Sequence, residues 1–136
     1  MSEPITTLDT IKTTLETLVS DQIEFAYLLG SAVTERFHSE SDIDLAVYWK
    51  KVPEFSEMVK IIAKLEIIFK RDVDLVSINT ADLVFSQQIL ETGRLLICHS
   101  PGLLLKWKTE QMAQYPDFKY SRKIIEDNIL QRKKHV

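Results

Sequence analysis

Three aspartates stand out because two of them open one strand-like apolar segment and the third opens the next. The first two lie in the run Asp42-Ile43-Asp44, and the third is Asp74, which follows Asp72 by two residues. Since side chains alternate along a strand, Asp42 and Asp44 share one face, roughly 7 Å apart at the backbone. Carboxylates gathered on one face repel one another unless a cation lies among them. The pattern therefore predicts a metal site.

Mg²⁺ is the ion that this pattern favours, because it takes oxygen ligands and commonly bridges carboxylates to substrate phosphates. Flexible carboxylates can converge on two ions that lie ~3.5–4 Å apart. If the strand that carries Asp74 lies beside the strand that carries Asp44, Asp74 joins the same cluster. We predict Asp42, Asp44 and Asp74 as ligands of two Mg²⁺ ions. Asp72 lies at a strand entrance, where a turn or salt-bridge role is expected.

A glycine–serine pair, Gly30-Ser31, follows the preceding apolar run and is separated from Asp42 by ten residues. Glycine permits a tight turn and close approach of a phosphate to the backbone. The Ser31 hydroxyl can donate a hydrogen bond to a phosphate oxygen. If a helical turn begins there, its free N–H groups also point at the ligand. An anion site beside a metal site suits a magnesium–nucleotide complex.

The elements that must position these residues are read from hydrophobic periodicity and turn residues. Strands are expected at residues 24–29, 43–49, 72–77 and 94–99, and helices at 2–20, 53–70, 80–92, 101–114 and 117–133. Gly93 is expected to end the third helix in the left-handed conformation. The order predicts an α/β fold, an α+β sandwich with a small mixed sheet of about four strands flanked by helices, in one domain of residues 1–136.

Composition excludes several classes of protein. A hydrophobic fraction of 45% and a charged fraction of 27% are typical of a globular domain. The net charge of −3 argues against direct nucleic-acid binding. The single cysteine, Cys98, is expected to be a small buried hydrophobe and fits a reducing compartment. We see neither a signal peptide nor an apolar run of the ~20 residues that a membrane helix needs. A cytoplasmic protein without a membrane association is predicted.

Other chemistry-bearing residues give no competing site. The histidines His38, His99 and His135 have no ligand spacing, so a zinc site is not expected. No histidine stands where it could serve Ser31 as a base, and phosphate binding explains that serine better. Trp107 and the aromatic residues after it are expected to pack between the last two helices.

The glycine–serine pair and the aspartates together resemble a known family signature. Gly30-Ser31, then ten residues, then Asp42-Ile43-Asp44 preceded by Ser41, resembles the signature of the nucleotidyltransferase superfamily related to DNA polymerase β. Residues 73–76 resemble the strand that carries the third carboxylate of that family. The short length and helix order resemble the minimal nucleotidyltransferases, including the MntA-type antitoxins of HEPN/MNT toxin–antitoxin systems. The resemblance implies the polymerase β-like fold.

The resemblance also implies roles for individual residues. Asp42 and Asp44 would hold Mg²⁺, and Asp74 would complete the cluster and help to activate an acceptor hydroxyl. Gly30, Ser31 and Ser41 would contact the nucleotide. Many minimal members carry Arg-Gly in the loop after Gly-Ser, where this chain has Thr34-Glu35. Arg36 is expected to take the place of that arginine.

The expected reaction is attack by an acceptor hydroxyl on the α-phosphate of ATP, with pyrophosphate leaving. Only about forty residues follow the fourth expected strand, so recognition of the acceptor is expected to come from a partner protein. The resemblance implies a HEPN-type ribonuclease toxin, modified with AMP on a tyrosine and thereby silenced. Two alternatives stay open: a non-catalytic antitoxin that neutralises by binding, and a small-molecule (antibiotic) nucleotidyltransferase that works with a helical partner subunit.

Overall fold

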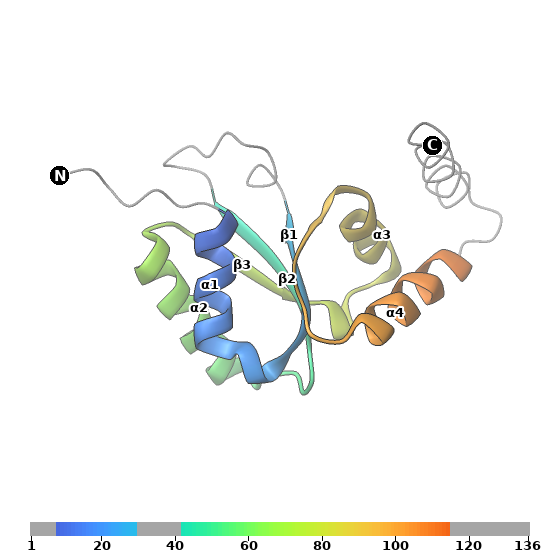
Figure 1. Ribbon diagram of the computed structural model, residues 1–136. Coiled ribbons are helices and arrows are strands. Elements are labelled where there is room, and N and C mark those ends of the chain that lie inside the picture. Colours follow the sequence, from blue (N-terminus) through green and yellow to red (C-terminus); the bar gives the residue numbers. More distant parts are fainter. Residues whose placement is uncertain (1–7, 30–41, 115–136) are drawn as a thin grey trace.

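A computed structural model describes residues 8–29 and 42–114 of the chain (Figure 1). The helices are α1 (Leu8–Val19), α2 (Phe55–Phe69), α3 (Leu83–Thr92) and α4 (Pro101–Ala113), and the strands are β1 (Ile23–Leu29), β2 (Ile43–Trp49), β3 (Val73–Ser77) and β4 (Arg94–Cys98). Short 3₁₀ turns, η1 (Ser20–Gln22) and η3 (Ile78–Thr80), precede β1 and follow β3. Each predicted strand is confirmed to within one residue at either end.

The four strands form one mixed sheet with the order β3-β2-β1-β4. β1 pairs antiparallel with both β2 and β4, whereas β3 runs parallel to β2. The parallel pair is joined through α2, as a parallel connection requires a crossover. The predicted mixed sheet of about four strands flanked by helices is confirmed.

Helices cover both faces of the sheet, with α1 and α2 on one side and α3 and α4 on the other (Figure 1). Alternation along β2 sends Ile43, Leu45, Val47 and Trp49 into the first layer, against α1 and α2. Alternation along β1 sends Phe25, Tyr27 and Leu29 into the second layer. The sheet is therefore the middle layer of a three-layer sandwich with a core on each face.

The left-handed helix end predicted at Gly93 is wrong, because this residue has an extended backbone with φ −77° and ψ 152°. Left-handed geometry occurs instead at Lys70, which ends α2 with φ 55° and donates its N–H to the Glu66 carbonyl at 2.8 Å. This conformation costs a residue with a side chain roughly 1–2 kcal/mol. Glycine is needed at position 93 for a different reason. A Cβ there would lie 2.5 Å from the Ile89 carbonyl oxygen and 3.0 Å from side-chain carbons of β1.

Helix α3 begins at Leu83, three residues later than predicted. The side chain of Asp82 caps it by accepting the N–H of Phe85 at 2.7 Å. The preceding turn is held against the end of β2 by Asn79. Its side chain accepts the N–H of Trp49 at 2.8 Å and donates to the carbonyl of the same residue at 2.9 Å. Because Asn79 is tied to β2, the helix cannot start there.

Trp107, which was predicted to pack between the last two helices, lies on α4 with its indole ring against β1, 5.5 Å from the ring centre of Phe25 and 6.1 Å from that of Tyr27. Cys98 is half-buried rather than fully buried, beside the same cluster. The predicted helix at 117–133 and residues 2–7 of the helix predicted at 2–20 lie outside the described residues. Among the described helices, none has the length and apolar character to span a bilayer.

Candidate functional site

The parallel register of β2 and β3 brings two of the predicted aspartates to the same level of the sheet. Asp44 is the ladder partner of Asp74, and the backbone N–H of Ile43 donates to the Asp72 carbonyl at 2.9 Å. Neighbouring strands lie about 4.8 Å apart. The strand adjacency on which the inclusion of Asp74 depended is therefore present. Asp72 itself lies one residue before β3, where its backbone starts the ladder.

The acidic residues occupy the sheet face that carries α3 and α4. Ile43 and Leu45 are buried on the opposite face, so Asp44 between them must point away from it. Asp44 is half-buried, whereas Asp42 and Asp74 are exposed. Val76, two residues further along β3, is also 36% exposed, so α3 and α4 leave the β3 side of this face uncovered. A ligand or a second protein can reach the acidic residues from that side.

The electrostatic environment of Asp44 includes both of the other aspartates. The pKa of Asp44 is raised above its ordinary value, first by burial and then by a side-chain hydrogen bond with Asp74. The negative charges of Asp74 and Asp42 raise it further. Two carboxyl groups in hydrogen-bond contact hold a proton between them more tightly than one alone. A divalent cation can replace that proton and remove the same repulsion.

The described residues contain no group of three or more His, Cys, Asp and Glu side chains already arranged around a metal position. Instead, Asp44 and Asp74 are in contact and Asp42 lies alongside. This open arrangement fits Mg²⁺, which keeps several waters and is commonly held by one or two carboxylates together with substrate phosphates. The donor set is all oxygen, as that ion requires.

The predicted nucleotide-binding residues Gly30, Ser31, Arg36 and Ser41 lie outside the described residues. Leu29, the last residue of β1 and the residue directly before Gly30, is the ladder partner of Asp44. The chain therefore leaves β1 beside the half-buried aspartate.

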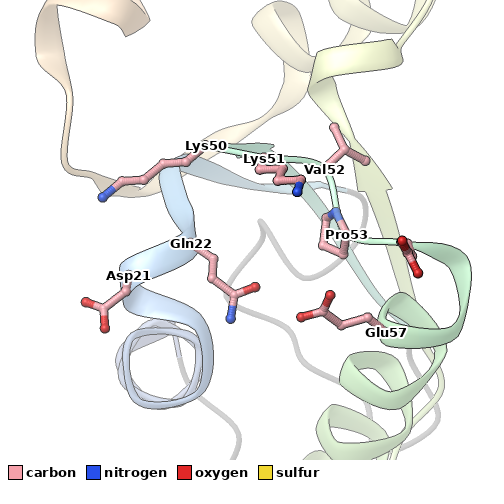
Figure 2. A pocket seen from close by; sticks show the side chains of 8 residues that line it. Asp21, Gln22, Lys50, Lys51, Val52, Pro53 and Glu57 are labelled. Carbon is pink, nitrogen blue, oxygen red and sulfur yellow. The ribbon is translucent and has the colours of Figure 1, made fainter.

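A pocket of about 350 Å³ lies at the opposite end of β2 (Figure 2). It is lined by Asp21, Gln22, Lys50, Lys51, Val52, Pro53, Glu54 and Glu57. Its lining therefore carries charges of both signs, from two lysines and three carboxylates. Because β2 runs from the acidic residues toward this pocket, with Lys50 directly after its last residue, the pocket does not belong to the acidic site.

One carboxylate near the site was missed by sequence reasoning. The Glu66 Oε2 atom, on α2, accepts the backbone N–H of Val73 at 3.0 Å, directly before Asp74. A signal was present in the sequence, because an acidic residue in the last turn of a helix opposes the helix dipole and needs a compensating partner.

Comparison with known proteins adds independent findings. The family described as polymerase beta, nucleotidyltransferase matches residues 9–102, which include all four strands of the sheet. The chain is also 26% identical over 118 residues to protein adenylyltransferase MntA of Shewanella oneidensis, with 80% of this chain and 78% of that protein covered.

Solved structures show the same fold. A chain of a toxin–antitoxin crystal structure with AMP-PNP superposes with a TM-score of 0.69 at 24% identity, covering 88% of this chain and 98% of that one. A chain from a complex of a tri-AMPylated Shewanella oneidensis HEPN toxin with its MNT antitoxin gives a TM-score of 0.66 at 22% identity, covering 90% and 98%.

Proposed function

Because the chain belongs to the polymerase β nucleotidyltransferase family, we propose that it transfers AMP from ATP to a hydroxyl of a partner protein. The partner proposed is a HEPN-type toxin, which this protein would silence as its antitoxin. The observation that carries the proposal is the contact between Asp44 and Asp74, on an open sheet face beside the end of β1. Grouped carboxylates of this kind have little structural use without a cation.

In this proposal Asp42, Asp44 and Asp74 hold two Mg²⁺ ions, and Gly30, Ser31, Ser41 and Arg36 bind the triphosphate. The ions would supply positive charge for the triphosphate and the departing pyrophosphate. Leu29 supports the placement of the nucleotide, since it brings the chain just before Gly30 to the level of Asp44.

Proton transfer is assigned to Asp74. Its carboxylate is proposed to accept the proton of the acceptor hydroxyl as that oxygen attacks the α-phosphate. Asp74 is exposed and lies on β3, the edge strand of the sheet, so an acceptor on another protein can reach it. The half-buried Asp44 is less accessible and is better suited to hold a cation than to meet the acceptor.

The acceptor proposed is a tyrosine of the toxin. Two similarities support this class of acceptor: the curated relative is named a protein adenylyltransferase, and one structural neighbour was solved with a tri-AMPylated HEPN toxin. Phenolic oxygen on a partner surface fits the open face better than a small molecule, which usually needs an enclosing pocket. We further propose that residues 1–136 act as a single domain and that the reaction occurs in the cytoplasm.

The decisive experiment incubates the protein with ATP and MgCl₂, with and without the product of the neighbouring gene, and measures intact masses. The expected result is a mass gain of one or more AMP units on the partner. Asp44→Asn should abolish the gain, whereas the matched control Asp72→Asn should retain it. Transfer to no partner and no small hydroxyl compound would overturn the enzymatic proposal.

Two alanine variants and a set of small hydroxyl compounds separate the alternatives. If Asp42→Ala and Asp44→Ala still protect cells from the toxin and still form the complex, neutralisation occurs by binding alone. If AMP appears on an aminoglycoside or another small hydroxyl compound and never on the partner, the protein is a small-molecule transferase.

A further inference from the structure

We propose that Glu66 is a positioning residue that fixes the free edge of β3 and thereby places Asp74 beside Asp44. This inference rests on the nucleotidyltransferase function proposed above. Glu66 is not among the residues predicted from the sequence, and it contacts backbone rather than a reacting atom.

The contact itself is specific. The Glu66 Oε2 atom accepts the Val73 N–H at 3.0 Å, and Val73 is the first residue of β3. On the other side of β3, the Ile43 N–H of β2 donates to the Asp72 carbonyl at 2.9 Å. Alternate residues of an edge strand direct their backbone groups to opposite sides. The start of β3 is therefore held from both sides, by β2 on one and by Glu66 on the other.

The location of Glu66 is otherwise unfavourable. It lies in the last turn of α2, where the negative end of the helix dipole disfavours a carboxylate. It also precedes two other carboxylates, those of Asp72 and Asp74, by only six and eight residues. The hydrogen bond to Val73 gives a physical reason for a carboxylate at this position.

Glu66 also closes the turn between α2 and β3 through its backbone. Its carbonyl accepts the Lys70 N–H at 2.8 Å, and Lys70 holds the left-handed conformation with φ 55°. A non-glycine residue keeps such a conformation where the surroundings over-determine it. Glu66 supplies such surroundings, because its carbonyl binds Lys70 at the start of the turn and its side chain binds Val73 at the end.

Loss of the hydrogen bond between Glu66 and Val73 would affect Asp74, because Asp74 directly follows Val73. If the Val73 amide is released, the start of a five-residue edge strand is held by β2 alone. A displacement of about 1 Å at a reacting group can reduce a rate by as much as about 10²-fold. Loss of the Glu66 acceptor should therefore weaken the alignment of Asp74 with Asp44.

The test compares Glu66→Ala with Glu66→Gln, which retains an amide oxygen as acceptor. Glu57→Ala is the matched control, because it removes an exposed carboxylate from the same helix. With ATP and the unmodified partner as substrates, Glu66→Ala should lower kcat about 10-fold and leave KM for ATP within about twofold. Glu66→Gln and Glu57→Ala should both stay within about twofold of the wild-type kcat.

A second readout does not depend on activity. Amide hydrogen exchange, measured by NMR on the protein alone, should speed up at Val73 and Asp74 in Glu66→Ala and stay unchanged at Ala26 in β1. If Glu66→Ala does not fold, Glu66→Asp replaces it, because the shorter side chain withdraws the acceptor while keeping the charge. An intermediate kcat and a local rise in exchange are then expected.

Three results would overturn the inference: a wild-type kcat in folded Glu66→Ala, a rise in exchange across the whole sheet, or a kcat in Glu66→Gln as low as in Glu66→Ala. The first denies a role in the reaction, the second indicates general stabilisation only, and the third points to charge instead of the hydrogen bond. If the wild-type protein transfers no AMP at all, the proposed function fails separately. The exchange measurement then still decides whether Glu66 holds β3.

Discussion

The two faces of β2 carry very different residues. On the face toward α1 and α2, the side chains of Ile43, Leu45, Val47 and Trp49 are at most 1% exposed. On the other face, Asp44 is half-buried and Tyr48 stacks its ring on Phe25 at 4.9 Å. One strand therefore supplies a closed apolar core and an accessible acidic site, separated only by the two-residue period of the strand.

The difference shows how a small domain can tolerate a destabilising site. The first core joins the apolar faces of α1, α2 and the sheet, and all of its buried residues are apolar. The second core, formed by α3, α4 and β1, ends before β3, so the carboxylates lie beside it and not within it. Burial of Asp44 is only partial, which limits the desolvation cost of its charge. The apolar core and the acidic residues therefore lie on opposite sides of one sheet.

The largest effect is expected for Asp44→Asn, which keeps the shape of the side chain and removes its charge. AMP transfer should fall about 10³-fold or more, since a group that stabilises transition-state charge is lost. Ionisation of Asp44 opposes folding, because its pKa is higher in the folded protein than in the unfolded chain. Without metal at pH 7, the variant should therefore be at least as stable in urea unfolding as the wild type. A clear loss of stability would contradict the separation of the two faces.

Leu45→Ala changes the neighbouring residue on the opposite face. Leu45 is 0% exposed, so the truncation should lower the unfolding free energy by about 3 kcal/mol, through lost burial and the cavity left behind. Urea denaturation measures the change. Leu105→Ala on α4, where the side chain is 66% exposed, should change it by less than about 0.5 kcal/mol. Similar losses in both variants would show that the first face is not the closed core described.

Gly93→Ala probes the packing of α3 on the second face. The added Cβ would lie 2.5 Å from the Ile89 carbonyl oxygen, a backbone atom that cannot move aside freely. We expect a loss of about 2 kcal/mol in thermal or urea unfolding. Gly102→Ala is the matched control on α4, where nothing lies within 4 Å of the new atom, and it should leave stability unchanged or raise it. Equal outcomes would refute tight packing at Gly93.

Tyr27 gives the smallest expected effect, at alkaline pH. Burial, followed by the charge of Cys98, raises the pKa of Tyr27 from 10.0 to about 12. Because the folded protein holds the phenol proton more tightly, its stability is unaffected below pH 10 and falls between pH 10 and 12. At pH 11 the loss should be about 1 kcal/mol relative to pH 9. Tyr27→Phe should remove this component from the wild-type pH profile. An identical profile for wild type and Tyr27→Phe would show that the second core is open to solvent at Tyr27.

Local patterns in the chain were enough to predict the elements. Alternation and apolar runs gave all four strands, and helical periodicity gave the end of α1 and both ends of α2 and α4 within a few residues. The errors occurred where a distant contact decides the local backbone. Asn79 binds the backbone of Trp49, thirty residues away, and delays α3. At Gly93 the nearby Ile89 carbonyl and the side chains of β1 together leave no room for a Cβ, and the β1 contribution is absent from any local rule for helix ends.

For the acidic residues too, one part of the arrangement follows from local sequence and another part from tertiary contacts. The sequence by itself determined that Asp42 and Asp44 share a strand face and that Asp74 opens another strand, because a two-residue period is a property of the local backbone. Only the tertiary structure decided that β3 pairs with β2 in the register that places Asp74 opposite Asp44, and that Glu66 holds this register from outside. Strand pairing depends on contacts between residues far apart in the chain. Local spacing therefore could not supply it.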